Sequence, residues 1–174
     1  SPPLRPADHA DDLWLGLLKD DLQVVSTDHC PFDFHGQKEM GQGDFRKIPN
    51  GLPGVENRVD LLHSGGVAAG RLSPNRWVEV ISTAPARMFG LAQKGGVQVG
   101  LDADIVIYDP KRTHTISAQT HHMDVDYSCY EGWEVTGAAD QVLSRGRIVV
   151  DGDEWLGERG GGQFVKRQRS AFLK

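Results

Sequence analysis

The sequence predicts an α/β protein with a helical first part built around a short buried strand, and a second part that forms an antiparallel sheet. Two observations predict this fold class. The apolar run at residues 22–25 is long enough for a buried parallel strand, and Pro31 prevents that strand from continuing. After Gly90, glycines separate short β-rich runs, which is typical of antiparallel sheets.

Helices are expected on both sides of the short strand. Residues 7–19 carry apolar side chains on one face, and the helix is expected to start near Asp8. Ser73 followed by Pro74 is typical of an N-cap with proline at the first helical position. The expected helices cover residues 7–19, residues 55–67 with an end at Gly65 and Gly66, a segment from Ser73 through Ile81, and a short segment from Pro85 to Gly90.

The second part of the chain is expected to hold short strands. They cover residues 103–108, 134–136, 141–144 and 147–150. Between the short strand and the helix expected at residues 55–67, residues 33–52 are polar and rich in glycine. Because this segment is too long for a plain connection, we expect a functional or mobile loop. Residues 157–162 read as a flexible linker and residues 163–167 as a terminal arm.

Asp28 would lie at the carboxyl end of the predicted strand. Strands of α/β barrels and open α/β sheets present catalytic side chains at this end. On this pattern alone, Asp28 is either a turn or N-cap residue, or else a metal ligand or general base. The neighbouring His29 is a candidate second metal ligand, but as the next residue along the chain it must leave the strand in another direction. A role in supporting the ligands or in packing is expected for it instead.

Composition narrows the class of protein. The net charge of −5, without a long run of Lys or Arg, argues against nucleic-acid binding. No apolar run approaches membrane-spanning length, so membrane association is not expected. Cys30 and Cys129 lie far apart in the sequence, and reduced thiols and a cytoplasmic location are expected.

Several motifs carry a family resemblance. Residues 26–32, Ser-Thr-Asp-His-Cys-Pro-Phe, resemble the strand-eight motif of the cyclic-amide hydrolases of the amidohydrolase superfamily, and look most like that of dihydropyrimidinases and D-hydantoinases. Residues 1–6 are similar to the segment after barrel strand seven of that family, and residues 47–51 are similar to its substrate loop. Residues 82–91 resemble its helix with the sequence Ser-Thr-Asn-Pro-Ala-Lys-x-Phe-Gly-Leu. Residues 94–110 resemble the return of the chain to its β-sandwich.

The resemblance implies a fold and a domain division. It places the C-terminal part of a (β/α)₈ metal-dependent hydrolase barrel at residues 1–91 and part of a β-sandwich at residues 92–156. Residues 157–174 would be a linker and arm. It also implies a longer protein, whose preceding part would complete the barrel, so residues 1–174 alone are expected to be inactive.

The resemblance further implies metal-dependent hydrolysis of cyclic amides, namely dihydropyrimidines and hydantoins, to N-carbamoyl amino acids, as in pyrimidine catabolism. By the same resemblance, Cys30 favours this branch over allantoinase-like relatives, which tend to carry Ser there and remain an alternative, and Phe32 favours it over dihydroorotases, which usually carry His. The other alternative is a non-catalytic dihydropyrimidinase-related scaffold protein. Because Asp28 and Asn50 are both present, an active lineage is favoured.

The same resemblance assigns roles to individual residues. Asp28 would bind metal and act as general acid and base, while Ser1 and Asn50 would contact the substrate through main-chain atoms. The cofactor would be a pair of divalent metal ions, most naturally zinc, with the remaining ligands on the preceding part of the protein. A homotetramer is expected, with no nucleic-acid partner.

Two further groups of residues have competing interpretations. Phe32, Phe34 and Phe45 could line the substrate pocket or pack in a core. His121 and His122, with nearby aspartates, superficially suggest a metal cluster. The family carries a similar segment in its sandwich, so polar contacts of a turn or sheet are expected there instead.

Overall fold

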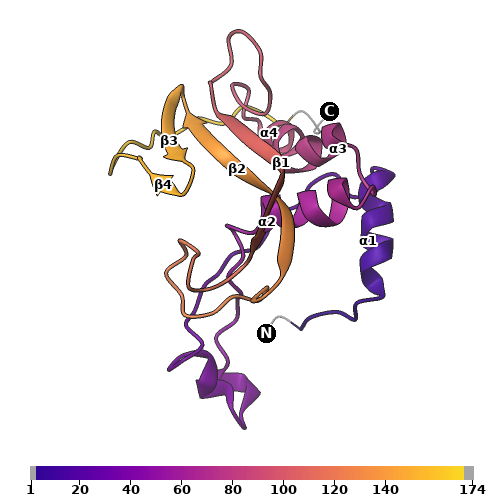
Figure 1. The fold of residues 1–174 in the computed structure, drawn as a ribbon, viewed down its shortest axis with the longest axis vertical. Helices are drawn as coiled ribbons and strands as arrows, with labels where there is room; N and C mark the ends of the chain where they lie inside the picture. The colour runs from indigo at the N-terminus through magenta and orange to yellow at the C-terminus, as the bar shows by residue number, and fades with distance from the viewer. Residues whose placement is uncertain (1–2, 171–174) are drawn as a thin grey trace.

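The computed structural model describes residues 3–170, with helices gathered on one side of a four-stranded antiparallel sheet (Figure 1). The elements in chain order are α1 (His9–Leu18), the 3₁₀ turns η1 (Lys38–Gly41) and η2 (Phe45–Lys47), α2 (Arg58–Leu62), the π-helical turn η3 (His63–Ala68), α3 (Pro74–Val78), the π-helical turn η4 (Glu79–Thr83), α4 (Ala84–Phe89), β1 (Ile105–Thr115), β2 (Glu134–Ser144), β3 (Arg147–Asp151) and β4 (Glu154–Trp155).

The local helix signals of the sequence are confirmed. α1 lies within the segment expected to be helical, and α3 begins at Pro74. The Ser73 hydroxyl caps α3 by accepting a hydrogen bond from the Arg76 N–H at 3.1 Å. α4 ends at Gly90, which has the left-handed backbone of a helix C-terminus.

One expected helix end is wrong. The helix that starts as α2 does not stop at Gly65 and Gly66 but continues through them as η3. The two glycines serve packing, because the Trp14 indole of α1 lies against them. A Cβ on Gly65 would lie 2.9 Å from Trp14 Cζ2, closer than real Cβ contacts allow.

The strand expected at residues 22–25 is also wrong, because this segment forms no strand within residues 3–170. A parallel strand needs a neighbouring strand to share its backbone hydrogen bonds. Here the backbone partners come from helices instead, and the Val25 N–H donates to the Val80 carbonyl of η4 at 3.1 Å. Val25 also packs on the hydrophobic core, so the segment is anchored although it is unpaired.

The sheet has the order β1-β2-β3-β4, with every neighbouring pair antiparallel. The two strands expected at residues 134–136 and 141–144 are one continuous strand, β2, which passes through Gly137. The expected first strand extends past Pro110, and the register shifts between Asp109 and Thr113. Proline is tolerated there because β1 is an edge strand of the sheet among the described residues.

Gly137 is required by close packing between the helices and the sheet. Its φ is +103°, and a Cβ there would lie 2.3 Å from His63 Nδ1 and 2.6 Å from the Tyr108 hydroxyl. The His63 ring is hydrogen-bonded to the Thr136 carbonyl at 2.7 Å. The Tyr108 hydroxyl donates to Asp60 at 3.0 Å, so polar contacts join η3 and α2 to the sheet.

The hydrophobic core lies between α1, α2 and the α3–η4 helix. Its buried members are Leu17, Leu62, Leu72, Trp77 and Val80. Side chains of this size contribute about 1.5–3 kcal/mol each when they are fully removed from water. The core therefore stabilises the platform from which residues 22–30 extend toward the loop at residues 33–52.

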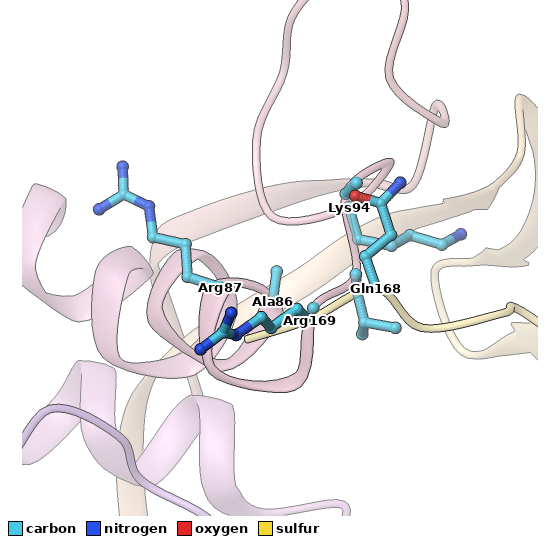
Figure 2. Close-up of a pocket in the computed structure, with 8 residues that line it drawn as sticks. Ala86, Arg87, Lys94, Gln168 and Arg169 are labelled. Carbon is cyan, nitrogen blue, oxygen red and sulfur yellow. The ribbon is translucent and has the colours of Figure 1, made fainter. Parts of the chain in front are cut away.

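The C-terminal segment crosses back to the end of α4. The Gln168 N–H donates to the Gly90 carbonyl at 2.8 Å. A small pocket lies at this junction, lined by Ala86, Arg87, Gly90, Leu91, Ala92, Lys94, Gln168 and Arg169 (Figure 2). The expected arm thus packs on the last helix. The expected division of the chain into a barrel part (residues 1–91), a sandwich part (92–156) and a linker with arm (157–174) stays a prediction.

Candidate active site

The segment that leads to Asp28 is held at several points along its backbone. The Arg76 guanidinium donates to the Leu22 carbonyl at 3.0 Å, and the Arg58 guanidinium donates to the Val25 carbonyl at 2.7 Å. Together with the Val25–Val80 bond, these contacts tie the segment to α2, α3 and η4. The chain before Asp28 is therefore held by the helices rather than by a neighbouring strand.

Asp28 itself has a left-handed backbone, with φ at +49°. Aspartate is one of the few residues other than glycine that adopts this conformation with some frequency. Its side chain is exposed, so the carboxylate is accessible to a ligand from outside the described residues. Within residues 3–170, no group of three or more His, Cys, Asp or Glu side chains could hold a metal ion.

These observations are compatible with Asp28 as one ligand of a metal site whose other ligands lie elsewhere in a longer protein. An exposed carboxylate is a suitable oxygen ligand for a divalent metal ion. As a single carboxylate, Asp28 could supply only one such ligand, and no group of side chains within residues 3–170 completes a metal site around it.

The Asp28 motif is joined to the segment after Asn50. His29 and Leu52 form an isolated parallel bridge, and the Cys30 N–H donates to the Leu52 carbonyl at 3.2 Å. The His29 ring adds a side-chain contact, because its Nδ1 accepts from the Gly54 N–H at 3.2 Å. The structure thus brings together the two segments that the sequence singled out separately.

Gly51 makes this approach possible. Its φ is +144°, and a Cβ at this position would lie 2.3 Å from the Cys30 carbonyl oxygen. Only glycine combines that backbone conformation with so close a contact. The adjacent Asn50 is exposed.

Lys38 is part of this loop and was not found by sequence reasoning. Its ammonium group donates to the Pro49 carbonyl at 2.6 Å and to the Gly51 carbonyl at 2.5 Å, on either side of Asn50. It also lies 5.5 Å from the centre of the Phe32 ring. A single lysine in a polar loop gives no sequence signal for such a role, because the carbonyls that it binds are known only from the fold.

The far side of the loop rests on the segment between β1 and β2 (Figure 1). The Asp126 carboxylate accepts from the Phe34 N–H at 2.6 Å and from the His35 N–H at 3.0 Å, and these bonds lower the pKa of Asp126. The Phe34 and Tyr127 rings meet edge to face, 5.9 Å apart. Contacts across about ninety residues of sequence therefore hold the loop.

The His121–His122 segment makes polar contacts, as expected. The His121 ring is hydrogen-bonded to the Val125 carbonyl at 2.9 Å, and the His122 ring pairs with Glu56 at 2.9 Å. Among the described residues, Cys30 and Cys129 are free cysteines, and their reduced state in the protein stays a prediction.

The remaining residues named as site candidates are Phe34, Phe45 and Ser1. Phe34 and Phe45 are exposed to 45% and 82%, so neither belongs to the core formed by the described residues. Ser1 lies outside those residues. No helix in the described part of the chain is long and apolar enough to span a membrane.

Residues 2–149 match the sequence model of the amidohydrolase family. The chain belongs to this family. It is 56% identical over 174 residues to a D-hydantoinase of Streptomyces coelicolor and 51% identical to a D-hydantoinase of Geobacillus stearothermophilus, covering 99% of this chain in each case. The chain spans only 37% of the length of these two relatives.

Solved structures agree with this assignment. A dihydropyrimidinase from Brevibacillus agri superimposes with a TM-score of 0.95 at 50% identity, covering 100% of this chain and 38% of that one. A D-hydantoinase from Bacillus sp. AR9 superimposes with a TM-score of 0.93 at 51% identity, covering 96% and 37%. The expected fold class, part of a metal-dependent hydrolase barrel with part of a β-sandwich, is confirmed.

Proposed function

We propose that residues 1–174 form the C-terminal portion of a longer metal-dependent hydrolase that opens cyclic amides, namely hydantoins and dihydropyrimidines, to N-carbamoyl amino acids. The observation that carries this proposal is the joining of two motifs. The exposed Asp28 carboxylate follows a helix-anchored segment, and its next two residues contact the Asn50 loop through Leu52. Similarity to D-hydantoinases and D-phenylhydantoinases supports the substrate class.

The reaction needs an activated water and a polarised carbonyl, because the amide is stabilised by resonance. The family is metal-dependent, and a divalent metal ion, when bound, lowers the pKa of water from 15.7 to about 7 and polarises the carbonyl. We propose zinc, as a pair held by Asp28 and by ligands from the preceding part of the protein.

The residues of this chain would supply proton transfer and orientation. Asp28 would accept the proton of the attacking water and deliver it to the leaving ring nitrogen as the C–N bond breaks. Backbone groups at Asn50 would bind the ring amide, so that the scissile carbonyl faces Asp28. Lys38 holds the carbonyls on either side of Asn50, which keeps this turn in one conformation.

The test is the exchange of Asp28 for asparagine in the longer protein that carries this chain. Asp28→Asn keeps the size and one ligand oxygen but removes the basic site, so kcat for hydantoin should fall by about 10²–10⁴-fold. Metal content, measured by elemental analysis, should be retained at least in part.

The matched control is Asp33→Asn, five residues along the chain, which should leave kcat nearly unchanged. The mechanism is wrong if Asp28→Asn keeps more than about a tenth of the wild-type kcat with metal bound. Turnover of hydantoin, dihydrouracil and allantoin by the wild type separates the proposed substrates from those of an allantoinase-like enzyme. A homotetramer and a cytoplasmic location stay predictions.

A further inference from the structure

His29 lies between Asp28 and the loop that follows Asn50, and its ring has a defined hydrogen-bonding role. Nδ1 is 3.2 Å from the Gly54 backbone nitrogen and 3.4 Å from the Val55 backbone nitrogen. A backbone N–H can only donate, so Nδ1 must accept and carries no proton. The proton of the neutral ring is then on Nε2.

This tautomer separates His29 from the metal ligands of a hydrolase. A neutral histidine that binds metal through one ring nitrogen has its proton on the other, which then donates a hydrogen bond to a carboxylate, carbonyl or water. In this structure Nδ1 accepts, and Nε2 holds the proton and has no lone pair for a metal ion. The geometry leaves His29 a role in holding the backbone.

We propose that His29 is a positioning residue, whose Nδ1 holds residues 54 and 55 and thereby keeps the Asn50 loop in register with Asp28. This inference rests on the proposed function. The ring contact reinforces the backbone contacts nearby, where Leu52 bridges His29 and its carbonyl accepts from the Cys30 N–H at 3.2 Å. Asp28 is the residue directly before His29, so the backbone that carries the carboxylate continues into the residue whose ring holds the loop.

Three variants of the longer protein test whether His29 acts as a hydrogen-bond acceptor, fills space or binds metal. His29→Asn places an amide oxygen near the position of Nδ1, His29→Gln places its oxygen near the position of Nε2, and His29→Leu offers no acceptor. The matched control is His35→Leu, because the His35 side chain lies in the same loop and is 77% exposed.

Steady-state kinetics with hydantoin give the first readout. His29→Asn should keep kcat/KM within about threefold of the wild type, while His29→Gln and His29→Leu should lose about 10–10²-fold, as expected for a small misplacement of binding groups. The loss should lie mainly in KM, because the loop binds the ring, whereas Asp28→Asn acts on kcat. Metal content should be unchanged in all three variants.

Amide hydrogen exchange gives a second readout that does not depend on activity. Exchange at Gly54 and Val55 should accelerate in His29→Leu and His29→Gln but not in His29→Asn or His35→Leu. If the wild type does not open hydantoin, the proposed function fails, and the exchange data still decide whether His29 holds the loop. Loss of metal from all three His29 variants, equal damage in His29→Asn and His29→Leu, or unchanged exchange in His29→Leu would each overturn the inference.

Discussion

Replacing Gly51 by alanine should uncouple the Asn50 loop from the Asp28 motif. Gly51 has φ at +144°, and a Cβ there would lie 2.3 Å from the Cys30 carbonyl oxygen and 2.6 Å from Cys30 Cβ. Gly43 in the same loop is a matched control: its φ is +77°, but a Cβ would meet no heavy atom within 4 Å. Both substitutions strain the backbone, and only Gly51→Ala also pushes two segments apart.

The size of the effect follows from these two contributions. An alanine forced into a backbone conformation that glycine occupies costs about 1–3 kcal/mol, and both variants incur a cost of this kind. In Gly51→Ala the new methyl group must also move away from Cys30 by about 1 Å to reach the 3.4 Å of ordinary contact. A displacement of about 1 Å in a binding group can lower the rate by about 10²-fold.

The assay is steady-state hydrolysis of hydantoin by the longer protein, with thermal unfolding as a measure of stability. Gly51→Ala should lose about 10²-fold in kcat/KM, and Gly51→Val should lose at least as much. Gly43→Ala should lower the melting temperature but keep kcat/KM within about threefold of the wild type. Asn50→Ala should lower kcat/KM less than Gly51→Ala does, because backbone atoms carry the proposed contact with the substrate. Equal kinetics for Gly51→Ala and Gly43→Ala would refute the reasoning.

Three further predictions follow from single side chains. Lys38→Met should raise KM about tenfold, because it removes charge-assisted hydrogen bonds to the carbonyls on either side of Asn50. The control Lys47→Met, at a side chain that is 67% exposed, should leave KM unchanged. Burial raises the pKa of Asp60 above its ordinary value, so the stability that its neutral form contributes is lost as pH rises through that raised pKa. Relative to wild type, Asp60→Asn should therefore be more stable above the raised pKa than below it, as measured by thermal unfolding across pH. Asp28→Gly should relieve a positive φ and raise the free energy of unfolding by about 1 kcal/mol while abolishing hydantoin turnover; a loss of stability on denaturation would contradict it.

The helix boundaries that depend on neighbouring residues were predictable from the sequence. Ser73 and Pro74 define the start of α3, and Gly90 ends α4, because caps and proline act within one turn of the chain. The continuation of the helix through Gly65 was not predictable in the same way. Its glycine is explained only by the indole of Trp14, which arrives from another helix.

The strands show the same division between local and non-local causes. The strand expected at residues 147–150 lies in β3, whereas the break expected between residues 136 and 141 is absent, because Gly137 lies within β2. It is glycine because His63 and Tyr108 pack against it, and neither residue is near it in sequence. The apolar run at residues 22–25 predicted a strand, yet its backbone partners lie on helices.

For the candidate site, the motifs located Asp28 and Asn50 but not the contacts between them. Spacing in sequence does not reveal that Leu52 bridges His29, or that Lys38 binds the carbonyls around Asn50. These contacts depend on a loop of about twenty residues returning to its own start, and on Asp126 holding its outer side. The sequence pattern selects candidate residues, whereas the fold determines which of them lie together.

The left-handed backbone of Asp28 is a consequence of those non-local contacts. Before it, Val25 is bound to the Val80 carbonyl; after it, Cys30 is bound to the Leu52 carbonyl. The chain must change direction between these two anchors, and it does so at Asp28, at a cost of about 1–3 kcal/mol. Such strain persists only where the surroundings over-determine it, so the direction of the carboxylate is set by η4 on one side and by the loop on the other. A substitution that weakens either anchor should therefore change the direction of the carboxylate, although the Asp28 side chain itself is unchanged.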